Sequence, residues 1–215
     1  MYYKKGIVIL LFAILVAGCA RPVRYKVSQE FFNTLPGTLA ILPVEGEVEG
    51  GGVEDAKVKE LFRNAALKKL KAMNYNVLPV EQTDEAYAKY KGSGPHEKGE
   101  KRAKEVSAFT ELIHADSVLY IDITEWEEDF FLTYAALKLK AEFTLYSKAG
   151  AVLWHAKYST KESEMRFDRE LLKMGVIRAY EPRIEKLVDT VLSTLPPHPL
   201  EKKEEEKPKR FFDWL

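Results

Sequence analysis

The residue best suited to do chemistry in this chain is Cys19, its only cysteine. A cysteine thiolate is a nucleophile, so it can be alkylated or acylated. This cysteine follows an apolar run over residues 7–18, and the basic pair Lys4 and Lys5 precedes that run. Twelve residues are too few to cross a bilayer, which needs about 20. The pattern is therefore typical of a signal peptide rather than of a transmembrane helix.

The tetrapeptide Val16-Ala17-Gly18-Cys19 resembles the lipobox of bacterial lipoprotein signal peptides. The resemblance implies cleavage before Cys19, a thioether-linked diacylglycerol on its sulfur and, in a double-membraned bacterium, a further acyl chain on its new amino group. Two or three chains anchor a protein durably, because each buried CH₂ contributes about 0.8 kcal/mol. Ala20 stands where enteric inner-membrane lipoproteins carry an aspartate, which favours the outer membrane facing the periplasm. The alternatives are an ordinary secretory signal with a chance cysteine, and a buried structural thiol.

No other group of residues has the spacing of a catalytic or metal site. The four histidines are scattered along the chain, at His96, His114, His155 and His198. No Gly-x-Ser-x-Gly, His-Glu-x-x-His or Cys-x-x-Cys motif occurs. One acidic cluster could bind a cation or form a pair of catalytic carboxylates, although such a run at a strand end is more typical of a solvated face. Its members are Asp122, Glu125, Glu127, Glu128 and Asp129. We therefore expect no enzyme activity, no metal site and no cofactor beyond the covalent lipid.

The C-terminus carries an aromatic segment at the end of a charged linker. Residues 201–210 are mostly Lys and Glu, and they have too little apolar surface to fold by themselves. The last five residues include Phe211, Phe212, Trp214 and Leu215. Because aromatic residues dominate binding hot spots, this segment is a candidate docking peptide for a groove on a partner. The alternative is that it folds back onto its own domain or contacts lipid.

The composition argues against a nucleic-acid partner and against a disulfide framework. The 215 residues include 33 basic and 33 acidic ones, and cleavage after Gly18 would leave a net charge of −2. Phosphate binding requires a concentrated basic surface, which this balance does not favour. A single, lipidated cysteine cannot form an intramolecular disulfide, even in an oxidising periplasm. The remaining 197 residues are typical of a single domain.

Patterning in the first half predicts a tether followed by alternating strands and helices. Residues 19–36 have no sustained periodicity, so we expect a lipidated tether there that lifts the folded domain off the membrane. The apolar run 38–44 predicts a buried strand, and a helix with one apolar face is expected from Asp55. The next elements are a strand at 77–80 and helices at 83–91 and 100–114.

Patterning in the second half predicts three strands and a final helix. The strands are expected at 117–126, 137–145 and 151–158, and the second alternates apolar and polar residues with a period of two. A helix is expected over 168–195, with a break or kink at Pro182. The order β-α-β-α, then a three-stranded antiparallel meander, then a helix predicts a single-domain α/β sandwich with a mixed sheet over residues 37–195. Residues 196–215 are then the charged linker and aromatic tail.

Two stretches carry a family resemblance. Ala115–Trp126 and the hairpin segment Lys148–Trp154 resemble a family of bacterial lipoproteins of unknown function. That family is similar in fold to the amino-terminal domain of TolB and to the periplasmic domain of the curli-secretion lipoprotein CsgG. The likeness covers most of residues 38–195, and it implies an α/β sandwich without catalytic residues that works in cell-envelope assemblies. Only the acylated Cys19 carries over as a functional residue, and the C-terminal tail falls outside the resemblance.

These observations predict a non-enzymatic lipoprotein that is anchored to the outer membrane, faces the periplasm and binds other proteins in an export or surface-assembly complex. The expected partners are the membrane, through the lipid on Cys19, and other envelope lipoproteins or outer-membrane proteins. A homo-oligomer is a further option, and no nucleic acid is expected. The alternative is a periplasmic carrier of a small ligand or cation, in a cleft near the acidic strand end. An envelope hydrolase is the third hypothesis.

Overall fold

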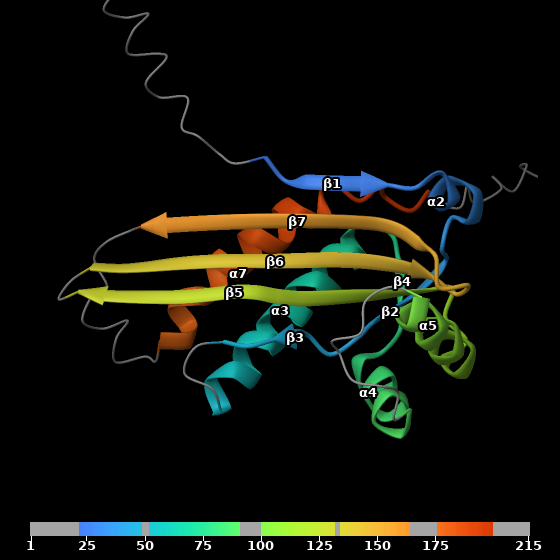
Figure 1. Ribbon diagram of the computed structural model, residues 1–215, viewed down its shortest axis with the longest axis horizontal. Coiled ribbons are helices and arrows are strands. Elements are labelled where there is room, and N and C mark those ends of the chain that lie inside the picture. The colour runs from blue at the N-terminus through green and yellow to red at the C-terminus, as the bar shows by residue number, and fades with distance from the viewer. Residues whose placement is uncertain (1–21, 49–51, 91–99, 132–133, 164–175, 200–215) are drawn as a thin grey trace, which may run out of the picture.

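The computed structural model describes residues 22–48, 52–90, 100–131, 134–163 and 176–199. Over these ranges the chain forms one mixed sheet of seven strands with helices packed on both faces (Figure 1). In chain order the elements are β1 (Arg24–Val27), α2 (Gln29–Thr34), β2 (Thr38–Ile41), β3 (Glu45–Gly46), α3 (Gly52–Ala72), β4 (Asn76–Val77), α4 (Val80–Lys89), α5 (Glu100–Ile113), β5 (Ser117–Phe131), β6 (Tyr134–Ser147), β7 (Val152–Ser163) and α7 (Val176–Leu192).

The strand order across the sheet is β1-β7-β6-β5-β2-β4, with β3 also pairing with β5. Strands β5, β6 and β7 form an antiparallel meander, whereas β2 and β3 run parallel to β5, and β4 runs parallel to β2. A short turn joins the antiparallel strands β6 and β7, while α3 lies between β3 and β4, and α4 and α5 lie between the parallel strands β4 and β5. The predicted α/β class, mixed sheet and meander are confirmed.

Helices α3 and α7 cover one face of the sheet and lie behind the long strands in Figure 1. The period-two pattern of β6 explains this packing, because Leu139 and Phe143 point into the core while Lys138 and Lys140 point to the opposite face. Trp154 on β7 is fully buried in the same core. Most of the hydrophobic stabilisation therefore comes from this layer, in which two helices pack on the meander.

Helices α4 and α5 form a second, smaller layer on the other face, over one end of the sheet. Val106 and Phe109 of α5 pack on Val118 of β5, and the rings of Tyr87 and Tyr90 contact Phe109 at centroid distances of 5.7 Å. The remainder of this face carries the polar side chains of β5, β6 and β7. The helices thus cover the sheet unequally on its two faces.

The prediction of an unstructured tether over residues 19–36 is wrong for residues 24–34. Strand β1 pairs with the edge strand β7, and α2 buries Phe31, which is only 2% exposed. The backbone N–H of Ser28 donates to the carbonyl of Leu153, and its hydroxyl caps α2. These interactions involve residues distant in sequence and leave no periodicity, which explains why local patterning misses them. The folded domain therefore begins at about Arg24.

Two boundaries in the first half also differ from the prediction. Helix α3 begins at Gly52 rather than at Asp55, and the Asp55 carboxylate accepts a hydrogen bond from the backbone N–H of Val48 outside the helix. The strand expected at 77–80 is only partly present as β4. Pro79 cannot donate to a strand ladder, and α4 begins directly after it.

Helix α7 continues through Pro182, where a break or kink is predicted. The helix is described from residue 176, so the earlier part of the predicted span, 168–175, lies outside the described residues. Among the helices of the described ranges, none combines the length and the apolar character needed to cross a membrane.

The domain also extends past its predicted end at residue 195. The backbone N–H of His198 donates to the carbonyl of Met73 at 3.0 Å, and its ring contacts that of Tyr75. The carbonyl of Pro196 accepts a hydrogen bond of 2.6 Å from the Tyr75 hydroxyl. Residues 196–198 are therefore packed against the turn between α3 and β4 instead of belonging to a free linker.

Candidate functional site

The residues singled out from the sequence as functional lie outside the described ranges. They are Cys19, Phe211, Phe212, Trp214 and Leu215. Lipidation of the cysteine and docking by the aromatic tail therefore stay predictions. Within the described residues, two other groups of side chains combine burial with charge.

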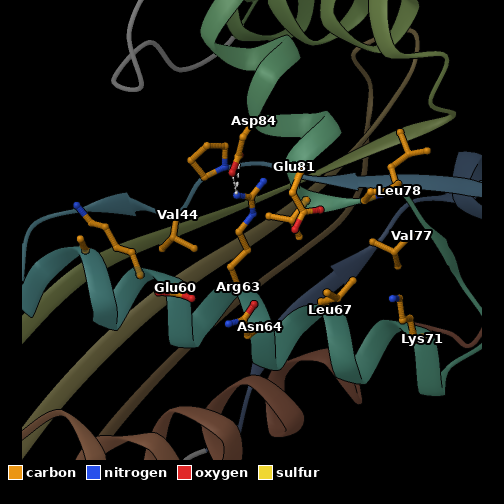
Figure 2. Close-up of a pocket in the computed structure, with 15 residues that line it drawn as sticks. Val44, Glu60, Arg63, Asn64, Leu67, Lys71, Val77, Leu78, Glu81 and Asp84 are labelled. Carbon is orange, nitrogen blue, oxygen red and sulfur yellow. Dashed lines mark hydrogen bonds and ion pairs between the residues drawn. The ribbon is translucent and has the colours of Figure 1, made fainter.

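The first group lines a groove of about 700 Å³ at the β4 edge of the sheet, between α3 and α4 (Figure 2). The parallel strands β2 and β4 end here, and the carboxyl ends of parallel strands are a common place for ligands to bind. The lining combines buried or half-buried apolar residues with the buried Arg63 and the half-buried Lys59 and Asp84, and most of its exposed residues are polar. The apolar residues include Val44, Leu67 and Val77, and the exposed polar ones are Glu60, Asn64, Lys71 and Glu81.

Arg63 of α3 lies at the centre of this groove and is 7% exposed. Its Nε and Nη2 donate to the carbonyl of Ile41, at 3.2 and 2.6 Å. Its Nη1 donates to both carboxylate oxygens of Asp84 on α4, at 2.6 and 2.8 Å (Figure 2). A planar guanidinium suits this role, because its fixed donors can serve a strand end and a carboxylate together. Arg63 therefore ties α3, β2 and α4 together.

This arrangement favours binding rather than catalysis in the groove. The central cation is already committed to Ile41 and Asp84, so it is not available to polarise a substrate. The exposed residues around it, Glu60, Asn64 and Glu81, lie on helix surfaces open to solvent. A surface with an apolar floor and a mixed polar rim resembles the centre and rim of a protein interface.

The second group is a polar cluster beneath α5, around Glu45 of β3. A guanidinium nitrogen of Arg102 lies 3.5 Å from the Glu45 carboxylate, and both side chains are 10% exposed. The same guanidinium lies over the ring of Tyr120, 4.9 Å from its centroid. Burial raises the pKa of Glu45 from 4.5 to about 7; Arg102 opposes this shift, while the Asp122 charge adds to it.

A carboxyl group with a pKa near neutrality can act as a general acid or base. No group of three or more His, Cys, Asp or Glu residues in the described ranges is placed to hold a metal ion. Oε1 of Glu45 and Oε1 of Glu105 are buried without a hydrogen-bond partner among the described atoms. We interpret the cluster as a group of polar side chains buried in the smaller core, where unmade hydrogen bonds lower the stability of the fold.

The acidic cluster predicted from the sequence forms cross-strand ion pairs in its described part. Glu125 pairs with Lys138 and Lys140, and Glu127 pairs with Lys138. The side chains of residues 128–129 lie outside the described set. Lysines therefore neutralise the carboxylates of Glu125 and Glu127 in the described part of the cluster.

Sequence patterning did not predict the groups around Arg63 and Glu45, and the reason is physical. Glu45 and Arg102 are far apart in the chain, and only the pairing of β3 with β5 brings them together. The sequence contains one indication that Arg63 is buried. It directly follows Phe62 in the apolar stripe of α3, where a charged residue is unexpected. A buried arginine of that kind requires a partner, but its identity depends on the fold.

Three solved structures are similar to this chain in part. The lipoprotein GNA1162 from Neisseria meningitidis is 19% identical with a TM-score of 0.49, over 70% of this chain and 99% of that chain. A PelC dodecamer from Paraburkholderia phytofirmans is 14% identical with a TM-score of 0.48, over 83% and 98%. The LpoB C-terminal domain from Escherichia coli is 16% identical with a TM-score of 0.38, over 60% and 85%. These likenesses carry no functional argument.

Sequence comparison gives the clearer assignment. No curated protein matches the chain. The model of the family described as "Putative lipoprotein GNA1162-like" matches residues 39–194. This match begins in β2 and ends just after α7, so it includes the large core, the groove at the β4 edge and the cluster around Glu45. The predicted membership of a bacterial lipoprotein family is confirmed, and the chain belongs to the GNA1162-like lipoprotein family.

Proposed function

We propose that this chain is a non-enzymatic lipoprotein, anchored to the outer membrane through lipid on Cys19, that binds other envelope proteins at the groove beside Arg63. Membership of a lipoprotein family supports the anchor. The groove carries the binding role, because it combines an apolar floor with a polar rim while its central cation is committed to Ile41 and Asp84. The resulting complex would serve export or surface assembly, as the predicted likeness in fold to TolB and CsgG suggests.

The mechanism we propose is co-localisation on a membrane. A lipid on Cys19 would confine the domain to a thin layer, which raises its effective concentration for other proteins anchored or embedded there. The chain between Cys19 and β1 is short, so the domain would stay near the bilayer. Partners of this kind include other lipoproteins, outer-membrane proteins and a second copy of this chain.

Site-specific photocrosslinking in native cells tests the groove as the binding surface. A photoreactive residue at Asn64 or Glu81 would lie on its rim, and one at Lys104 would lie on the exposed surface of α5 as a matched control. We expect one defined crosslinked envelope protein from the groove positions and none from position 104. Equal crosslinking at all three positions, or none at any, would contradict the proposal.

The contacts of residues 196–198 with the folded domain define where to truncate the chain in a test of the C-terminal docking tail. Truncation after Pro199 removes Phe211, Phe212, Trp214 and Leu215 and keeps the contacts of residues 196–198 with the body. If the tail binds a partner, this truncation should abolish recovery of that partner from crosslinked membranes without changing the thermal unfolding of the domain. Full recovery of every partner would sink the docking-tail hypothesis and leave the groove unaffected.

The groove also supports a second candidate function, which is binding of a small ligand. Its volume of about 700 Å³ lies within the range of ligand pockets, roughly 300 to 1,000 Å³. A carrier predicts ligand-dependent thermal stabilisation of the purified protein, lost on changing Leu67 to a charged residue and indifferent to removal of residues 200–215. A screen of periplasmic metabolites and cations by thermal shift separates this function from protein binding.

A further inference from the structure

The C-terminal end of the described chain leaves the domain beside the groove at the β4 edge. The backbone N–H of His198 donates to the carbonyl of Met73 at 3.0 Å, and its ring contacts that of Tyr75. Lys71 precedes Met73 by two residues, Val77 follows Tyr75 by two residues, and both line the groove (Figure 2). The chain that follows His198 therefore starts next to one end of the groove.

The chain beyond the described residues is long enough to reach every part of the groove. Along α3 the lining extends from Lys71 back to Ala56, about 22 Å at 1.5 Å per residue. Twelve residue steps separate Pro199 from Phe211. A flexible linker of this length spans about 19 Å on average, and full extension reaches about 40 Å. The segment 211–215 can therefore enter the groove of its own chain without a stretched linker.

The apolar part of the groove suits an aromatic segment, and the described residues leave it open. Its apolar lining includes the buried or half-buried residues Pro43, Val44, Leu67, Val77, Leu78 and Val80. Segment 211–215 contains Phe211, Phe212, Trp214 and Leu215. Aromatic side chains bury a large area and dominate binding hot spots. The groove volume of about 700 Å³ is in the range that encloses a drug-sized ligand, so it has room for side chains of this kind.

The charges of the groove rim and of the C-terminal segment are complementary. Glu60 and Glu81 are exposed on the rim, and neither forms an ion pair with another residue of the described ranges. The sequence Lys-Pro-Lys-Arg at 207–210 directly precedes the aromatic residues and carries three positive charges. Lys71 is an exposed cation of the rim, and Asp213 is the acidic residue within the aromatic segment. Complementary charges of this kind favour the groove over other apolar surfaces.

We infer that the aromatic tail, residues 211–215, docks into the groove of its own chain and competes there with the partner. This inference rests on the groove being the binding surface of the proposed function. A short linker gives the tail an effective concentration in the millimolar range. A tail that binds with a dissociation constant of about 100 µM then occupies about nine-tenths of the grooves and weakens partner binding about tenfold. The tail thus acts as a tethered inhibitor that a tightly binding partner displaces.

Photocrosslinking of the full lipidated chain in native membranes tests this inference. A photoreactive residue replaces Asn64 on the groove rim, and the control carries it at Lys104 on the exposed surface of α5. Trypsin cleaves after Arg210, so a crosslinked peptide that starts at Phe211 identifies the tail by mass spectrometry. We expect position 64 to crosslink to that peptide in protein of monomer mass, and we expect no such crosslink from position 104.

A charge exchange separates specific docking from chance contact. The pair of substitutions Glu60→Lys and Glu81→Lys should weaken docking about tenfold, because the rim then repels residues 207–210. Occupancy falls from about nine-tenths to about one-half, so the yield of the tail crosslink should fall about twofold. Adding Lys207→Glu and Lys209→Glu should restore it. An unchanged yield after the first pair, or no recovery after the second, overturns the inference, with circular dichroism as the check on folding.

Truncation after Pro199 links the tail to the partner. It should raise crosslinking from position 64 to another envelope protein by up to about tenfold, which is the opposite of the loss expected if the tail itself binds the partner. A tail crosslink found only at dimer mass assigns the groove to a second copy and overturns the inference. Capture of an envelope protein without any tail crosslink also overturns it and leaves the proposed function standing. A tail crosslink with no protein captured after truncation supports docking and overturns the proposed function.

Discussion

At the scale of single residues, Arg63 shows how one buried cation organises an edge of the sheet. Its guanidinium connects the end of β2 with α4 through Ile41 and Asp84. We expect Asp84→Ala to lower the free energy of unfolding by about 1 to 2 kcal/mol, because the substitution leaves a buried charge with one partner fewer. The loss stays below the 3 to 5 kcal/mol that is typical of a fully buried ion pair, since the Asp84 side chain is 47% exposed.

Urea unfolding of the purified domain measures this difference, and Glu81→Ala provides a matched control on the same helix. Glu81 is exposed on the groove rim, so its removal should change stability by no more than about 0.5 kcal/mol. Equal effects of the two substitutions would show that the pair of Arg63 with Asp84 does not support the groove.

Glu45 should make stability depend on pH in a defined direction. Burial raises its pKa from 4.5 to about 7, so between these values the folded protein retains a proton that the unfolded chain has released. Its contribution to stability is therefore complete below about pH 4.5 and is lost as the pH rises through about 7. We expect Glu45→Gln, which remains neutral, to flatten the fall in unfolding free energy between about pH 5 and pH 8.

The groups that face Glu45 are Arg102, Asp122, Glu105 and Lys59, and all remain in the Glu45→Gln variant. Glu47→Gln is the control, since Glu47 is an exposed carboxylate two residues away. Denaturant unfolding at several pH values should give parallel curves for this control and the unmodified protein. A curve for Glu45→Gln that also runs parallel would contradict the assignment of the pH dependence to Glu45.

At the scale of elements, the N-terminal segment β1–α2 belongs to the folded domain. Phe31 is 2% exposed in the large core, whereas its neighbour Phe32 is 52% exposed. We expect Phe31→Ala to cost about 3 to 5 kcal/mol, the range for a buried phenylalanine, and Phe32→Ala to cost less than about 1 kcal/mol. Thermal and urea unfolding of the two variants make the comparison, and equal costs would indicate that α2 does not contribute to the core.

The elements that could be predicted from sequence are those whose signal is local. The alternation of Leu139 and Phe143 with Lys138 and Lys140 specifies β6 and its buried face, and the apolar stripe of α3 specifies that helix. Strands β1 and β3 could not be found in this way, because each has four residues or fewer and exists only through pairing with a distant strand. The cluster around Glu45 was missed for the same reason, since β3 positions that residue.

At the scale of the whole molecule, the strand nearest the proposed anchor and the proposed binding groove lie at different edges of one sheet. Strand β1, next to the proposed lipid, is one edge, and β4, beside the groove, is the other. The meander between them is neutralised by cross-strand ion pairs, including that of Lys157 with Glu142 at 2.6 Å. In the proposed arrangement, the strands between β1 and β4 separate the anchored N-terminal segment from the groove, so a partner in the groove would not compete with the anchor for the same edge.

Two truncations separate residues 196–198, which contact the folded domain, from the proposed docking tail that follows Pro199. Tyr75 is buried, and its hydroxyl donates to the carbonyl of Pro196. Truncation after Leu195 removes that acceptor together with the His198 contact, so we expect a loss of about 1 to 2 kcal/mol in unfolding free energy. Truncation after Pro199 keeps both contacts and should leave stability unchanged in urea unfolding. If the two truncated proteins were equally stable, residues 196–198 would contribute nothing to the domain, and the tail would effectively begin at residue 196.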